Sequence, residues 1–337
     1  MPADRALDPC LQRPLHRRHL MALAAAVAAP AGALAATYPT RPVRVFVGAV
    51  AGGPADFLAR LFCDTAITPL GQAGVVENKP GASSTFAADA AAKVAPDGHG
   101  LLVTGPAAIA MAPHLFPKLT YDPQKDLTPV AMLGAGAFVL VVHASVPARS
   151  VQELIALAKS RPGGLNFGSG GNGSSGQMCT ELFAQGAGIK MTHVPYKGDG
   201  AAMADLLGGQ IQVMFTAPNV AAPHVKAGRL RLLAVTTRAR VPSMPDVPTI
   251  SEAAVKDFEY LGWIALYAPS GTPKPVLEAL VASWDKARRT PAVRAKLDEL
   301  AMAPPEGIVS GEPLAQFMRN ESTRIGRLIR ELDIKAD

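Results

Sequence analysis

Aromatic residues are scarce in this chain, and its positive charge exceeds its negative charge only slightly. Phe, Trp and Tyr make up 5% of the 337 residues, and 33 Lys and Arg stand against 27 Asp and Glu. Nucleic-acid-binding proteins usually gather basic residues in one stripe with aromatic residues between them, whereas the charges here are scattered. We therefore expect no nucleic acid among the partners.

Cysteine is rarer still, with three residues in the whole chain. Cys10 lies near the N-terminus, while Cys63 and Cys179 fall on two separate predicted helices. An oxidising compartment would allow a bridge between these two, but their placement gives it little support. No group of His, Cys, Asp and Glu has the spacing of a metal site, so we expect neither a metal nor a cofactor.

Strongly apolar runs of membrane-spanning length are missing as well. The weakly hydrophobic run 20–29 follows three arginines, and Ala33-Leu34-Ala35 has the small-x-small spacing that signal peptidase reads. We predict a signal peptide over 1–35, cleaved near Ala35, and a periplasmic protein; the general secretory and twin-arginine routes both stay open. Removing this segment takes away four basic and two acidic residues and leaves a net charge of +4.

Short apolar runs alternate with amphipathic stretches along the rest of the chain, which is typical of α/β proteins. The first set has predicted strands over 43–47, 74–77 and 101–104 and helices over 55–66 and 85–94. A second set begins with a helix that has capping-box spacing at 150–153 and ends at Pro162-Gly163-Gly164. Its predicted strands are 165–167, 191–194, 211–215 and 230–235, and its other helices are 175–185, 201–207 and 220–227.

Two long apolar segments, 130–142 and 258–268, bracket the second set. We interpret them as crossings between two α/β lobes, an arrangement that lets the lobes close on a ligand. The helices predicted after the second crossing would return to cover the first lobe; they span 273–290, 291–300 and 312–332. The predicted domains are the signal peptide 1–35, a discontinuous lobe 1 over 36–138 and 260–337, and a lobe 2 over 139–259.

A glycine-rich loop over 48–56 follows the first predicted strand directly. Ligands of open parallel sheets bind outside the carboxyl ends of the strands. The paired Gly52 and Gly53 let the backbone approach a ligand, and the free N–H groups of the following helix attract an anion. A plain tight turn beside a solvated Asp56–Arg60 pair explains the same residues, so both interpretations stay open.

A second loop, 168–175, gathers backbone and hydroxyl donors at a helix start, which suits a carboxylate. It also fits the dinucleotide pattern G-x-G-x-x-G through Gly168, Gly170 and Gly173. A ribose would need an Asp or Glu about 20 residues further on, and 185–195 contains neither. Carboxylate binding is therefore favoured over nucleotide binding. The interpretation as a plain glycine-rich turn without a ligand ranks between these two.

A catalytic interpretation of this loop would use Ser174 or Ser175 as nucleophile and His193 as base. The G-x-S-x-G spacing of a nucleophile elbow is missing, because Asn172 and Gln177 occupy the outer positions where glycine is required. We therefore predict no catalytic residue.

Taken in order, short motifs over nearly the whole chain after residue 37 resemble the Bug-type periplasmic solute receptors of tripartite tricarboxylate transporters. Each motif is short, and their specificity comes from ten of them standing in register. They are YPTRPVR (38–44), AGG (51–53) with Asp56 and Arg60, VENKPGA (76–82), APDG (95–98), YDP (121–123) with KDLTPV (125–130), the loop 168–175, HVPYKG (193–198), DLLGG (205–209), PDVPT (245–249), and Trp263 with APSGTP (268–273).

The resemblance implies a type II periplasmic-binding-protein fold with a ligand cleft between the lobes, and a receptor without catalysis. It also implies a carboxylate ligand held by backbone and hydroxyl donors with ordered water, and the transporter's small and large membrane proteins, including its permease, as partners. We expect the chain itself to be a monomer. By position, the ligand-binding residues would be Ala51, Gly52, Gly53, Thr104 and Gly105 from lobe 1, and Ser169, Gly170, Asn172, Gly173, Ser174, Ser175 and Thr216 from lobe 2.

Departures from the family pattern bear on the ligand. Gly48-Ala49 replaces a common Pro-Phe, Pro54-Ala55 replaces Gly-Thr, Gln177 replaces a frequent His, and Thr216 replaces a frequent Asp. Loss of that Asp weakens the case for a ligand with an amine, so we expect an unsubstituted or hydroxylated mono- or dicarboxylate, or an aromatic acid. A receptor that signals to a membrane sensor and an enzyme on the same fold remain the alternatives.

Overall fold

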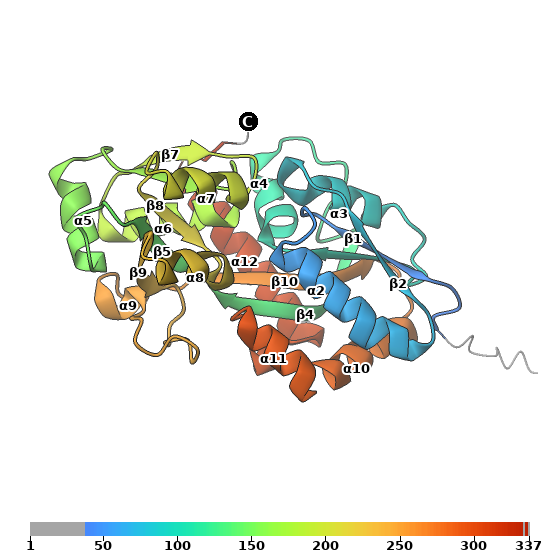
Figure 1. The fold of residues 1–337 in the computed structure, drawn as a ribbon. Coiled ribbons are helices and arrows are strands. Elements are labelled where there is room, and N and C mark those ends of the chain that lie inside the picture. The colour runs from blue at the N-terminus through green and yellow to red at the C-terminus, as the bar shows by residue number, and fades with distance from the viewer. Residues whose placement is uncertain (1–37, 333, 336–337) are drawn as a thin grey trace, which may run out of the picture. The chain divides into compact units, whose positions relative to one another are not determined.

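Two five-stranded sheets organise the chain in a computed structural model, which describes residues 38–332 and 334–335 (Figure 1). The predicted signal peptide, 1–35, lies outside these residues. The first sheet has the order β2 (Gly74–Asn78), β1 (Val43–Val47), β3 (Gly100–Thr104), β10 (Leu261–Pro269) and β4 (Leu127–Ala137). The second has the order β7 (Thr192–Pro195), β6 (Asn166–Ser169), β8 (Val213–Thr216), β5 (Val139–His143) and β9 (Leu230–Val235).

Both sheets are mixed: each combines parallel and antiparallel strand pairs. Strand β1 runs parallel to β2 and β3, but β10 runs antiparallel to β3 and β4. In the second sheet, β6 runs parallel to β7 and β8, whereas β5 runs antiparallel to β8 and β9. The antiparallel members are the strands that carry the chain from one sheet to the other.

The helices begin and end where local sequence signals place them. Ser150 accepts a hydrogen bond from the Glu153 N–H at the start of α5, and Gly188 ends α6 in a left-handed conformation. Thr249 and Glu252 form a complete capping box. The helices of at least eight residues are α2 (Pro54–Phe62), α3 (Thr85–Ala92), α5 (Val151–Ser160), α6 (Ser175–Ala187), α7 (Asp199–Leu207), α8 (Pro218–Lys226), α10 (Lys274–Arg288), α11 (Pro291–Glu299) and α12 (Gly311–Glu331).

The two predicted crossings are adjacent in space and joined through one hydroxyl. β4 ends at Ala137 and β5 begins at Val139, so the chain changes sheets at Phe138. The Phe138 N–H donates to Thr236 Oγ1 at 2.8 Å, and this hydroxyl donates to the Tyr260 carbonyl at 2.7 Å, just before β10. Because Thr236 is fully buried, both crossings depend on a bond that water does not reach.

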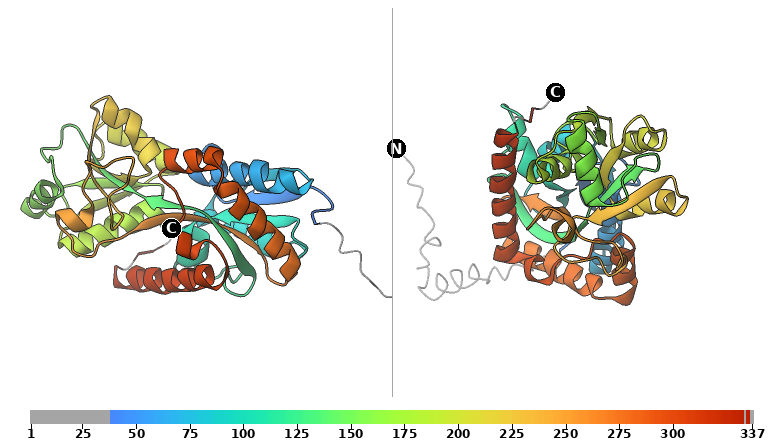
Figure 2. Two further views of the ribbon diagram at one scale, coloured as in Figure 1. Left: turned by 90° about the horizontal axis from the view of Figure 1, so that it is seen from below. Right: turned by 90° about the vertical axis from the view of Figure 1, so that its left-hand side faces the viewer.

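The C-terminal helices return to the first sheet. Trp284 of α10 donates its indole N–H to the Met132 carbonyl of β4 at 3.0 Å, and Ser283 donates to the Ala66 carbonyl at 2.6 Å. Helix α12 packs along β4 and the π-helical turn Ala107–Met111, and Figure 2 shows it lying along one side of the first sheet. We refer to each sheet with its packed helices as the first and second lobe.

Two cysteines lie within the described residues, and both are in helical segments. Cys63 begins a short π-helical turn after α2 and Cys179 lies in α6; both are buried and unpaired. Burial raises the pKa of the Cys63 thiol to about 12, which makes it unreactive. In the part of the chain that the structure covers, none of the helices combines the length and the apolar character needed to cross a bilayer.

Candidate ligand-binding site

Strand register places the carboxyl ends of the parallel strands β1 and β3, and of β6 and β8, toward the crossings. Thr104, the last residue of β3, pairs with Ala265, and the β4–β10 ladder continues from there to Ala137, where the chain leaves the first sheet. In the second sheet, Thr216 ends β8 and pairs with Val139, the first residue after the crossing. The loops that follow β1, β3, β6 and β8 therefore emerge at the edges where the two lobes meet, as carboxyl-end binding requires.

Two predicted ligand residues at these edges have buried hydroxyls without a protein partner. Thr104 is 2% exposed and Thr216 is fully buried, and neither Oγ1 has a hydrogen bond among the described residues. Most buried polar side-chain atoms are hydrogen-bonded, so an orphan hydroxyl calls for an explanation, which a bound ligand or water would supply. After Thr104 the chain passes close to β10: a Cβ at Gly105 would lie 3.0 Å from the Trp263 carbonyl oxygen.

The first loop is held by a buried carboxylate rather than by a solvated ion pair. Asp56 is 3% exposed, and Arg60 donates to both of its carboxylate oxygens at 2.9 Å. The Gly52 N–H donates to Asp56 Oδ2 at 3.0 Å. Asn78 Nδ2, at the end of β2, donates to Asp56 Oδ1 at 3.0 Å and to the Ala49 carbonyl at 2.9 Å. Of the predicted residues here, Ala51 and Gly52 are exposed, and Gly53 is the N-cap of α2.

The second loop is tied to β7 by a serine–histidine contact. Ser169 Oγ lies 2.7 Å from His193 Nε2 and 3.1 Å from the Gly171 carbonyl, and the His193 ring stacks on Phe167 at 4.8 Å. The pairing of His193 with Ser174 or Ser175, which the sequence spacing argued against, is not the one that forms: the structure places His193 on Ser169. Because Ser169 is fully buried, this pair fixes the start of the loop.

The remaining predicted residues of this loop form the start of α6. The Gly173 N–H donates to Gln177 Oε1 at 2.8 Å, and Ser174 accepts a bond from the Gln177 N–H as the N-cap. Gln177 is 6% exposed, so its side chain supports the loop from inside. Ser175 is the first residue of α6 and lies beside the buried phenol of Tyr260.

Asp199 was not anticipated from the sequence, yet it contacts this loop. It is the first residue of α7, and its carboxylate accepts a hydrogen bond from the Gly170 N–H. A Cβ at Gly170 would lie 2.6 Å from Asp199 Oδ1, so only glycine allows this approach. The side chain is exposed, but surrounding protein still desolvates it and raises the pKa of its carboxyl, against the bond from Gly170. The Gly170 N–H, which belongs to a predicted ligand-binding residue, is thus already bonded to the Asp199 carboxylate.

We expect the Asp199→Asn variant to be more stable than the parent at neutral pH, by less than about 1 kcal/mol because the group is exposed. A raised folded-state pKa means that ionisation of Asp199 opposes folding, and this cost develops as pH rises through the ordinary and then the folded pKa. The difference should vanish well below pH 4, where both forms are neutral. Thermal melts of the two proteins from pH 3 to 8 measure it; a gap that does not change with pH would contradict it.

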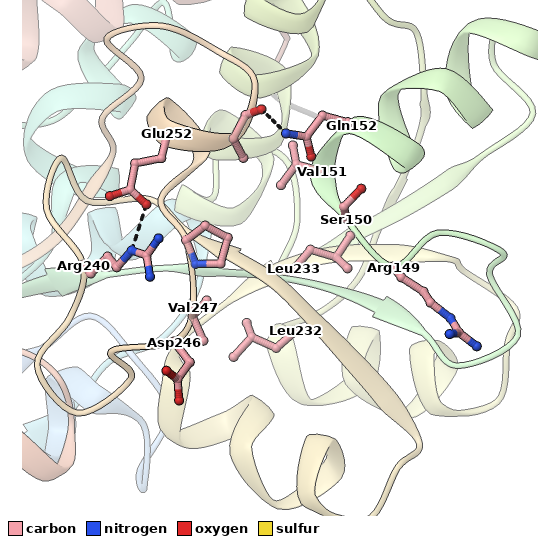
Figure 3. Close-up of a pocket in the computed structure, with 12 residues that line it drawn as sticks. Arg149, Ser150, Val151, Gln152, Leu232, Leu233, Arg240, Asp246, Val247 and Glu252 are labelled. Carbon is pink, nitrogen blue, oxygen red and sulfur yellow. Dashed lines mark hydrogen bonds and ion pairs between the residues drawn. The ribbon is translucent and has the colours of Figure 1, made fainter.

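A surface pocket of about 470 Å³ lies elsewhere, on the second lobe between the start of α5, β9 and the segment before β10 (Figure 3). Two bonds join lining residues to each other: Arg240 Nε donates to Glu252 Oε2 at 2.9 Å, and Gln152 donates to the Ala253 carbonyl. Val151, Leu232, Leu233 and Val247 supply its apolar walls. The pocket shares no residue with the predicted ligand site.

Fold and loops together define a class of protein, the two-lobed solute receptors with the periplasmic-binding-protein fold. The comparisons with known proteins then give the family. The family described as "Tripartite tricarboxylate transporter family receptor" matches residues 58–334, and this chain belongs to it. The chain is 34% identical over 312 residues to protein BugT of Bordetella pertussis, covering 92% of this chain and 94% of BugT. The predicted Bug-type resemblance is confirmed.

Solved structures confirm the two-lobed α/β fold. Rpa4515 of R. palustris, determined with adipate, has a TM-score of 0.81 and 32% identity and covers 89% of this chain and 100% of its own. MatC of Rhodopseudomonas palustris, determined with bound malate, has a TM-score of 0.78 and 34% identity and covers 87% of this chain and 100% of its own. Members of this family are periplasmic receptors that work with the membrane components of tripartite transporters.

Proposed function

We propose that this chain captures a small carboxylate between its two lobes and delivers it to the membrane components of a tripartite tricarboxylate transporter. The observation that carries the proposal is the pair of orphan hydroxyls, Thr104 Oγ1 and Thr216 Oγ1, buried at the carboxyl ends of strands in two different sheets. A hydroxyl can donate to a carboxylate oxygen or to a water that bridges to it. A ligand that engages both therefore joins the lobes.

The proposed ligand is an unsubstituted or hydroxylated mono- or dicarboxylate, or an aromatic acid. The candidate ligand residues are all uncharged, so the negative charge would be met by backbone N–H groups and hydroxyls at strand ends and helix starts. Thr216 provides no counter-charge for a ligand amine. Bound adipate in Rpa4515 and bound malate in MatC support this class of ligand.

The lobes would comprise 36–138 with 260–337, and 139–259, and the membrane permease would receive the ligand-loaded, monomeric protein. The chain would reach the periplasm through cleavage near Ala35. It would act without catalysis: Ser169, the serine beside His193, uses its hydroxyl within its own loop, where it lies 3.1 Å from the Gly171 carbonyl.

The experiment that tests the site replaces each orphan hydroxyl by a methyl group of similar size. Thr104→Val and Thr216→Val should each raise the Kd for the best-bound carboxylate about 2- to 10-fold, because one hydrogen bond contributes about 0.5–1.5 kcal/mol. Neither change breaks a protein hydrogen bond, so both variants should be as stable as the parent or more stable. Isothermal titration with adipate, malate and benzoate, after unfolding and refolding to remove any bound ligand, gives the Kd values.

Thr180→Val is the matched control. Thr180 is also fully buried, but its hydroxyl donates to the Gly176 carbonyl at 2.8 Å within α6. This variant should bind as the parent does and lose stability. Parent-like affinity in both Thr104→Val and Thr216→Val would remove these residues from the site, and absence of binding to any of the three acids by the parent would refute the proposed ligand class.

A further inference from the structure

The segment Gly81–Ser84, between β2 and α3, has an unusual backbone. Ala82, Ser83 and Ser84 have φ values of 44°, 53° and 68°, a left-handed region that residues other than glycine seldom adopt. Strain of this kind persists only where surrounding contacts hold it, and it clusters at binding sites and clamps. Three such residues in succession therefore call for contacts that fix them.

One of these contacts joins the segment to the first ligand loop. Ser84 Oγ donates to the Gly48 carbonyl at 2.8 Å. A Cβ at Gly48 would lie 2.4 Å from the Ser84 Cβ, so glycine at this position is required for the approach. The strained segment is thus anchored beside the loop that follows β1.

A second contact reaches the other lobe. Ser83 Oγ donates to the Asn172 carbonyl at 3.3 Å, in the loop that follows β6. A Cβ at Gly173 would lie 2.5 Å from Leu115 Cδ1 and 3.4 Å from Ser83 Oγ. The second ligand loop therefore rests on two elements of the first lobe, the strained segment and the end of α4 (Ala112–Leu115).

We propose that Ser83 and Leu115 form a clasp that holds the two lobes together and so positions both ligand loops. The inference builds on the receptor function proposed above, because receptors of this kind bind by hinge closure. Apparent affinity falls in proportion to the fraction of molecules in the binding-competent arrangement. Since Ser83 and Leu115 contact protein on the opposite lobe, the clasp acts on this fraction and changes the Kd of every ligand by the same factor.

The clasp is tested first by ligand affinity. Ser83→Ala and Ser83→Gly should each raise the Kd for adipate, malate and benzoate by one factor that is the same for all three acids, about 2 to 10, the range that one hydrogen bond spans. Leu115→Ala, which removes an apolar contact, should likewise raise the three Kd values by one shared factor. Ser83→Gly also relieves the strain at φ 53°, so its melting temperature should equal or exceed that of Ser83→Ala while its affinity falls equally. Ser160→Ala is the matched control, because Ser160 is exposed and donates to the Leu157 carbonyl within its own lobe.

A second measurement needs no ligand and so separates this inference from the proposed function. Spin labels at Lys125→Cys and Lys190→Cys, exposed positions of the first and second lobes, report the distance between lobes. Ser83→Ala and Leu115→Ala should add a population at longer distance in the ligand-free protein, and Ser160→Ala should not. Unchanged distances in both variants, or a Kd factor that differs from one carboxylate to another, would overturn the clasp. If the parent binds none of these acids, the proposed function fails and the distances still decide the clasp.

Discussion

The Trp284→Ala variant should lose about 3–5 kcal/mol of unfolding free energy. Trp284 is fully buried, its ring meets Phe62 edge-on at 5.9 Å, and its indole N–H donates to the Met132 carbonyl. The substitution leaves a cavity between α10, α2 and β4 and an unpaired carbonyl in the first sheet. Urea unfolding of the ligand-free protein measures the loss.

Trp263 supplies the control for the hydrogen-bond part of this effect. It is equally buried, at 1% exposure, but its indole N–H has no protein partner among the described residues. Trp284→Phe should therefore lower the free energy of unfolding by about 1–3 kcal/mol more than Trp263→Phe does, because only Trp284→Phe leaves a carbonyl without its partner. Equal costs would mean that the Trp284 bond contributes nothing net, and a loss below about 1 kcal/mol for Trp284→Ala would mean that α10 is not part of the first lobe's core.

The second large effect concerns binding rather than folding. Asp56→Ala should raise the Kd for the carboxylate ligand at least about tenfold, because a hydrogen bond to a charged group contributes about 1.5–3 kcal/mol and Asp56 anchors the first loop through Gly52 and Asn78. Asp56→Asn should give a smaller loss, since the amide oxygen keeps one acceptor. Titration calorimetry of both variants, with circular dichroism to confirm folding, checks this expectation.

The same carboxylate predicts a pH dependence in acid. Burial alone would raise the pKa of Asp56, but hydrogen bonds from Arg60, Gly52 and Asn78 outweigh it and hold the pKa below its ordinary value. A depressed folded-state pKa contributes stability that is complete above the unfolded pKa of about 3.9 and is lost as pH falls through the folded pKa. The stability gap between parent and Asp56→Asn should therefore be constant from pH 5 to 8 and close below about pH 4. A gap that closes near neutrality would point to another group.

Local elements could be predicted closely because their signals lie within a few residues. The expected strands over 43–47 and 230–235 match β1 and β9, and the expected starts of α6 and α11 at Ser175 and Pro291 agree with the structure. Alternation, helical spacing, caps and glycine-rich loops are all short-range patterns, so they can be recognised in the sequence without knowledge of the fold. The same patterns placed both glycine-rich loops after the correct strands.

Non-local contacts at the site could not be predicted in this way. The sequence left open whether Asp56 and Arg60 form only a solvated pair, and it gave no sign that Asn78, 22 residues away, would bind the buried Asp56 carboxylate. It also gave no sign that Asp199 would engage Gly170. Each of these partners sits on another strand or helix, and only the packing of that element decides whether the two groups meet.

By itself the sequence determined the α/β alternation, the two crossings, the positions of the glycine-rich loops and the family, since these depend on residue order and short spacing. Only the tertiary structure decided that the hydroxyls of Thr104 and Thr216 stay without partners and that Ser83 reaches Asn172, 89 residues away. Whether a polar atom is satisfied depends on every neighbour that the completed fold brings within hydrogen-bonding distance. That information is created by strand register and by the meeting of the two lobes, and no local pattern contains it.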